Sequence, residues 1–94
     1  SQQGSGVGIL ESTLPSEVYL YPNPFADELH LELGQYYGSI RLVMYDMIGQ
    51  TIYSQQYNGV NRIDPTMDVA AGTYTLRLED DQGRYAMFRI VRKR

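Results

Sequence analysis

The chain contains no cysteine and no tryptophan, and His30 is its single histidine. Without cysteine there is no disulfide framework, and cysteine usage indicates no redox compartment. One histidine leaves too few nitrogen or sulfur ligands for a typical transition-metal centre. It also leaves one candidate base for a serine or threonine nucleophile. No nucleophile-elbow motif is present, so we expect neither an enzyme nor a cofactor.

Long hydrophobic runs are also missing, so we expect no membrane-spanning segment. The first eight residues, "SQQGSGVG", are polar and glycine-rich and do not resemble a signal peptide. If the domain is exported, we expect the signal to lie upstream in a longer protein. The net charge of −3 and the pI near 4.9 argue against a general nucleic-acid-binding role.

The size of the chain, 94 residues, favours one domain, and its hydrophobic fraction of 43% suffices for one modest core. We expect residues 1–16 to be a flexible linker and residues 17–94 to be the folded domain. Nine tyrosines suit half-buried strand surfaces. A sugar-stacking platform is the alternative reading of these rings, but ordinary sheet packing is favoured.

Apolar and polar residues alternate with a period of two in several short segments. In "ELHLEL", Leu29, Leu31 and Leu33 share one face. Such segments, separated by Gly, Asn, Asp and Pro, predict an all-β, antiparallel β-sandwich of six or seven strands. The expected strands are 17–21, 28–33, 40–46, 51–57, 73–79 and 84–93. The expected turns are 34–39, 46–50, 58–61 and 80–83.

The segment "YPNPF", residues 21–25, lies between two expected strands. Pro22 and Pro24 restrict φ and lack an N–H, so strand pairing must stop there. We expect a stiff corner at which the chain crosses from one layer of the sandwich to the other. Asn23 is expected to tie this corner through side-chain hydrogen bonds to the backbone, with Phe25 packed beneath it.

Two polar clusters have a functional and a structural interpretation. Glu28, His30 and Glu32 share a strand face, which suggests a carboxylate–histidine site, but a solvated strand face is favoured because one strand rarely completes a metal centre. Asp80 and Asp81 before Gly83 suggest calcium, but the spacing fits a hairpin turn better.

Basic residues gather near the C-terminus, in "RIVRKR". They fit electrostatic recognition of an anionic or acidic partner. They fit equally well the protection of an exposed edge strand by charge. The sequence leaves both interpretations open.

Four short motifs occur in a specific order: "YPNPF", "VMYDMIGQTIY", "AAGTYTLRL" and "FRIVRKR". Together they resemble the C-terminal sorting domain of type IX secretion in the Bacteroidetes, over about Val18 to Arg94. The segment before Ala71 departs from the family pattern by carrying Pro65 and Asp68, and many members end in lysine. The residues that match the family motifs are Pro22, Asn23, Pro24, Asp46, Gly49, Gln50, Ala71, Gly72, Tyr74, Arg92, Lys93 and Arg94.

The resemblance implies an immunoglobulin-like sandwich of about seven strands that directs a cargo protein through the type IX outer-membrane translocon. The implied partners are the translocon, its shuttle proteins and a surface sortase that commonly removes the domain. The implied route is the periplasm, then the outer-membrane surface or the medium. The motif residues, apart from Ala71, are then candidates for translocon recognition. The linker residues Gln3, Gly4, Ser5 and Gly6 are candidates for processing.

Two other functions fit the same composition. A carbohydrate- or protein-binding accessory module of a surface protein predicts that deletion spares secretion and weakens binding. A structural spacer predicts that neither changes. Pairing through edge strands would make a homo-oligomer under any of these readings.

Overall fold

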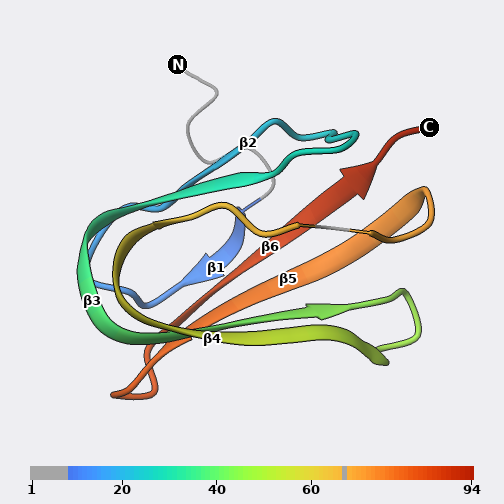
Figure 1. Cartoon of the computed structure of the whole chain (residues 1–94). Helices are drawn as coiled ribbons and strands as arrows, with labels where there is room; N and C mark the ends of the chain where they lie inside the picture. Colours follow the sequence, from blue (N-terminus) through green and yellow to red (C-terminus); the bar gives the residue numbers. More distant parts are fainter. Residues whose placement is uncertain (1–8, 67) are drawn as a thin grey trace.

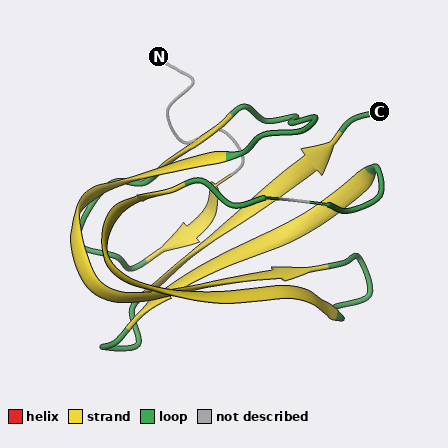
Figure 2. Ribbon diagram, viewed as in Figure 1, coloured by secondary structure: helices red, strands yellow, loops and turns green. Residues whose placement is uncertain are grey.

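The computed structural model describes residues 9–66 and 68–94. These residues form strands and loops, and no helix occurs among them (Figure 2). The described part of the chain therefore contains no helix able to cross a membrane. The strands are β1 (Ile9–Ser12), β2 (Tyr19–Tyr21), β3 (His30–Tyr45), β4 (Thr51–Ile63), β5 (Gly72–Asp80) and β6 (Tyr85–Arg92).

Strand β3 lies at the centre of one antiparallel sheet. Its first part pairs with β2 and its second part pairs with β5, while β4 pairs with both parts of β3. The two long strands bend together, so the sheet curls into two layers (Figure 1). The expected all-β antiparallel sandwich is confirmed. The described residues form six strands, against about seven expected, because β3 and β4 each serve both layers.

Turns expected at 34–39 and 58–61 are wrong, because both segments are bends inside continuous strands. Gly34 has φ of 80°, and a Cβ there would lie 2.5 Å from the Glu17 carbonyl oxygen. Gly59 has φ of 66°, and its Cβ would meet the Tyr36 hydroxyl at 2.7 Å. Glycine thus allows the positive φ at both bends and the close approach of Gly34 to the Glu17 backbone.

The core lies between the two layers. The predicted alternation is confirmed in the first layer, where the three leucines of "ELHLEL" are buried, and in the second, where Leu76 and Leu78 of β5 are buried. Each buried aliphatic side chain of this kind stabilises the fold by about 2 kcal/mol. The other fully buried large side chains are Phe25, Ile40, Leu42, Met44, Ile63, Phe88 and Ile90.

Strand β6 is not an edge strand, so one of the two interpretations of the basic C-terminus, the protection of an exposed edge strand by charge, is wrong. One side pairs with β5. The other side pairs with β1 over residues 86–88 and then with Phe25, which bridges to Arg92. The expected linker 1–16 therefore includes a paired strand at Ile9–Ser12. Its short, partly polar sequence gave no clear strand signal, because pairing with β6 is a long-range contact.

Candidate functional site

The four motifs meet at one end of the sandwich. The "PNP" corner follows β2, the turn Asp46–Gln50 joins β3 to β4, Gly72 begins β5, and the basic residues end β6. Antiparallel pairing places Tyr45 opposite Thr75 and Gly72 opposite Arg92. We call this region, at the right of Figure 1, the motif end. The opposite end contains the β5–β6 turn, and we call it the far end.

Asn23 links the "PNP" corner to β6. Its Nδ2 donates to the Arg89 carbonyl over 3.0 Å, and its Oδ1 accepts from the Val91 N–H over 3.0 Å. The side-chain amide thus takes the place of a backbone partner along β6. This confirms the expected hydrogen bonds of Asn23 to the backbone.

Phe25 continues the contact with β6. Its N–H donates to the Val91 carbonyl over 2.8 Å, and its carbonyl accepts from the Lys93 N–H over 2.8 Å. Its ring is fully buried. The segment reaches from β2 to β6 of the other layer and then returns to β3, which pairs with β2. The expected crossing of the chain from one layer to the other is therefore wrong, because the corner joins two strands of the same layer. Phe25 closes the outer edge of the C-terminal strand.

The turn Asp46–Gln50, which we call the first turn, is held by one aspartate. The Asp46 Oδ1 accepts from the N–H of Ile48 over 3.1 Å and from that of Gln50 over 2.9 Å. The Asp46 N–H donates to the Gln50 carbonyl over 2.9 Å. Gly49 supplies φ of 87°. The family motif residues Asp46 and Gly49 therefore fix the shape of this turn.

The first turn and the start of β5 together line a hollow. The hollow is lined by Met47 and Ile48 on one side and by Ala71, Gly72 and Thr73 on the other. Tyr74 is a buried residue, and its hydroxyl donates to the Ala70 carbonyl over 2.6 Å and ties the approach to β5 in place. Small residues at 71 and 72 leave the hollow open to solvent.

The C-terminal residues combine structural and free charges. Arg92 lies 3.6 Å from the Asp27 carboxylate and donates to the Lys93 carbonyl over 3.0 Å. Its Nε is buried without a hydrogen-bond partner among the described residues. Lys93 and Arg94 are exposed, and neither forms an ion pair within residues 9–66 and 68–94. The exposed cations of this end that form no ion pair among the described residues are therefore Arg89, Lys93 and Arg94.

His30 belongs to an ion-pair network on the outer face of the β2 layer. Its Nδ1 lies 2.7 Å from the Asp64 Oδ1 and its Nε2 lies 3.3 Å from the Glu28 Oε1. Arg62 pairs with Asp64 over 3.0 Å and also with Glu32. The hydrogen bond with Asp64 raises the pKa of His30 and lowers the pKa of Asp64.

This network includes Arg62 and Asp64, which the sequence analysis missed. The available signal was weak: Arg62 lies opposite Glu32 only because of the β3–β4 register. Among the described residues, no group of three or more His, Cys, Asp or Glu side chains is arranged to hold a metal ion. An arginine at the centre of the network favours structural charge pairing over cation binding.

The far end contains a second turn, Asp80–Arg84, at the expected hairpin position. The Asp80 Oδ1 accepts from the N–H groups of Gln82 and Arg84, each over 2.9 Å, and its Oδ2 pairs with the Arg84 Nε over 2.7 Å. Burial raises the pKa of Asp80, but these hydrogen bonds outweigh it, so the pKa lies below its ordinary value. Asp80 is 6% exposed.

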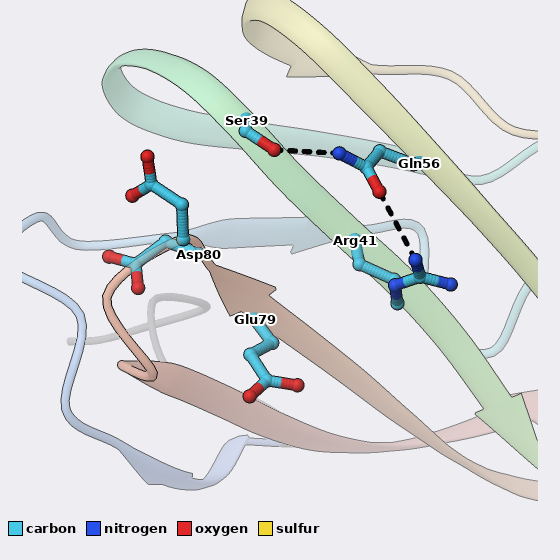
Figure 3. Close-up of a pocket in the computed structure, with 6 residues that line it drawn as sticks. Ser39, Arg41, Gln56, Glu79 and Asp80 are labelled. Carbon is cyan, nitrogen blue, oxygen red and sulfur yellow. Dashed lines mark hydrogen bonds between the residues drawn. The ribbon is translucent and has the colours of Figure 1, made fainter.

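A polar hollow lies beside the second turn (Figure 3). Gln56 donates to Ser39 over 2.8 Å and accepts from Arg41 over 3.1 Å. The side chains therefore satisfy one another across neighbouring strands. Asp80, which lines the same hollow, is already engaged by the second turn. This arrangement is that of a cross-strand polar ladder.

The fold and the motif end define a class: a small antiparallel β-sandwich that carries its sequence motifs at one end. A family model described as the secretion system C-terminal sorting domain matches residues 19–92. The chain belongs to this family, which is the type IX sorting family that its motifs resemble. No curated protein and no solved structure matches the chain.

Family membership supports a role as a sorting signal in type IX secretion, with export to the cell surface or the medium. It implies interaction with the secretion system, and the family is not one of enzymes. The processing candidates Gln3, Gly4, Ser5 and Gly6 lie outside the described residues. The sequence analysis did not single out Met47 and Ile48, although both lie within a quoted motif.

Proposed function

We propose that the motif end is the surface by which the translocon and its shuttle proteins recognise this sorting domain. The supporting observation is the meeting of four motifs at one end of the sandwich, where Asn23 contacts Val91, which lies 68 residues later in the sequence. The domain thus acts as a folded address label for its cargo.

The proposed residues divide into two groups by their contacts. Asn23, Asp46 and Gly49 hold the surface in shape through backbone hydrogen bonds and turn geometry. Lys93 and Arg94 carry free charge toward a partner. The remaining proposed residues are Pro22, Pro24, Gln50, Gly72, Tyr74 and Arg92.

A backbone hydrogen bond of Lys93 determines which variant tests the terminal charge alone. The Lys93 N–H bonds to the Phe25 carbonyl, so truncation of residues 92–94 would also open the corner that closes β6. Lys93→Gln with Arg94→Gln removes the charge and keeps the backbone. We expect this variant to bind the translocon more weakly and with less dependence on salt.

Processing and anchoring form the later part of the proposal. A surface sortase would remove the domain at residues 1–8 after transit through the periplasm, and the cargo would be joined to the surface. Glycine and serine dominate that segment, and such sequences enter protease clefts readily. Mass spectrometry of the mature cargo tests this point, and cleavage inside 17–94 would contradict it.

The accessory-module alternative receives less support from the side-chain contacts. Tyr37 and Tyr74 are buried, and Tyr53 and Tyr57 pack against the core. The Tyr85 ring is covered by Arg77, whose guanidinium lies 4.6 Å from its centroid. These five tyrosines are already used by the fold, which leaves Tyr19, Tyr21 and Tyr36 as the exposed rings for a sugar-stacking platform.

The test is a fusion of Ser1–Arg94 to a periplasm-directed fluorescent protein in a bacterium with type IX secretion. We expect fluorescence at the surface or in the medium, and none in a strain that lacks the translocon. A folded fusion that remains in the periplasm of the competent strain would contradict the sorting function. Such a result would favour the binding-module alternative, for which glycans and envelope proteins are the next ligands to screen.

A further inference from the structure

The first and second turns share one backbone design. In each, an aspartate Oδ1 accepts two N–H groups, two and four residues later. In each, a glycine at the fourth position has positive φ, 87° for Gly49 and 79° for Gly83. The aspartate N–H also bonds to the carbonyl of the fifth residue over 2.9 Å in both turns. The two turns are therefore equivalent position by position.

Their tip residues differ in chemistry. The first turn presents Met47 and Ile48, which are 77% and 86% exposed. The second turn presents Asp81 and Gln82 at the same two positions, and both are exposed. The second turn proves that this backbone forms with polar tips, so the fold does not require the apolar pair. Exposed apolar side chains that the fold does not need indicate a contact with something else.

The surroundings of the tip suggest the nature of that contact. Met47 and Ile48 line the hollow formed with Ala71, Gly72 and Thr73. Gly72 pairs with Arg92, after which come the two free cations of the C-terminus. An apolar projection beside unpaired positive charge is complementary to an apolar socket with an acidic rim.

We propose that Met47 and Ile48 insert into an apolar socket with an acidic rim on a protein of the secretion apparatus. This inference rests on the proposed function and identifies the contact that carries affinity. The aspartate-braced turn holds the two side chains in place before binding, which reduces the entropy lost on association. Burial of two such side chains corresponds to about 100-fold in affinity.

An anionic lipid surface and a second copy of the chain fit the charges near the apolar tip less well than a protein partner does. The carboxylates of Asp27 and Glu28, whose side chains are 92% and 79% exposed, line a hollow together with Lys93. An anionic lipid surface would repel these two carboxylates. A second copy in a two-fold contact would bring Lys93 and Arg94 against their own equivalents. A protein partner can match both signs.

The test uses the double variant Met47→Asn with Ile48→Gln, which we call the tip variant, in the fluorescent fusion. Asn is the neutral counterpart of Asp81 at the far end, and Gln is the residue found at position 82. We expect export to fall at least 10-fold and affinity for the purified translocon complex in detergent to fall about 100-fold. The melting temperature should not change. The matched control is Tyr36→Asn, which removes an apolar side chain that is 69% exposed on the bend of β3, and it should be exported normally.

A transplant tests whether position matters. Adding Asp81→Met and Gln82→Ile to the tip variant restores an apolar tip at the far end, and we expect no recovery of export. Recovery would show that apolar surface suffices anywhere, which overturns the inference. Undiminished export of the tip variant, or an equal loss with Tyr36→Asn, would overturn it as well.

Direct binding measurements separate the other occupants. If the wild-type chain floats with anionic phospholipid vesicles and the tip variant does not, the partner of Met47 and Ile48 is a membrane, and the protein socket is ruled out. If sedimentation shows that the wild-type chain is a dimer and the tip variant a monomer, the partner is a second copy of the chain, and the protein socket is ruled out. A wild-type fusion that is not exported would overturn the proposed function and this inference together, whereas normal export of the tip variant overturns the inference alone.

Discussion

The first and second turns place the same backbone in two different roles. At the far end, Asp80 is buried and paired with Arg84, and its tip is polar. At the motif end, Asp46 is partly exposed and faces no arginine in its turn, and its tip is apolar. The comparison teaches that the aspartate and glycine determine the turn, while the two residues between them are free to serve function.

The largest expected loss of stability is that of Asp80→Ala, and it should exceed the loss caused by Asp46→Ala. Asp80→Ala removes a buried carboxylate and leaves two N–H groups and the partly exposed Arg84 guanidinium without their acceptor, and we expect a loss of about 2 kcal/mol. Asp46→Ala exposes its N–H groups to water, and we expect a loss of about 1 kcal/mol. Urea unfolding measures both. Equal losses would contradict the comparison, and Asp81→Ala serves as the control with little change.

Lowering the pH should destabilise the wild type through protonation of Asp80, and Asp80→Asn should remove this pH dependence. The folded-state pKa of Asp80 lies below its ordinary value, because the hydrogen bonds from Gln82 and Arg84 outweigh the effect of burial. Ionised Asp80 therefore stabilises the fold above pH about 4, and this contribution is lost as the pH falls through the folded-state pKa. We expect the Tm of the wild type to fall more steeply between about pH 5 and 2 than that of the variant. Parallel curves would contradict this assignment.

The two turn glycines should respond alike. Gly49→Ala and Gly83→Ala place a Cβ on positive-φ backbone, and a Cβ at either position has no heavy atom within 4 Å. The cost is then conformational in both, about 1 kcal/mol each. Thermal or urea unfolding of the two variants should agree within about 0.5 kcal/mol. A much larger loss at Gly49 would show that the first turn has additional constraints.

The smallest expected effect concerns the tip itself. Met47→Asn with Ile48→Gln should change the free energy of unfolding by less than about 0.5 kcal/mol, because both side chains are exposed. The same variant should lose export, so stability and function should separate. A loss of several kcal/mol in urea unfolding would instead assign the apolar tip to the fold.

Local patterns in the sequence predicted what depends on neighbouring residues. The alternation of Leu29, Leu31 and Leu33 placed one face of β3 in the core, and the turn aspartates and glycines marked both hairpins. Each of these signals acts within about five residues of the chain. The sandwich class followed from them.

Long-range contacts account for what the sequence did not predict. Pairing of β1 with β6 and the ion pair of Arg62 with Glu32 depend on register between distant segments. The glycines of 34–39 and 58–61 indicated turns, but the two strands bend together there, and their pairing resumes at Tyr37 and Val60 after a register shift. The apolar tip was not predicted, because the exposure of Met47 and Ile48 depends on the folded structure. Comparison with the equivalent polar turn then shows that the fold does not require this apolar pair.

The central claim is that the motif end, and not the far end, contacts the secretion machinery. The most direct measurement places a photo-crosslinking amino acid at position 47 or at the equivalent position 81 of the exported fusion, in cells with an active translocon. We predict crosslinks to an identified translocon component from position 47 and none from position 81. Equal crosslinking from both positions, or crosslinking to that component from position 81 alone, would contradict the claim.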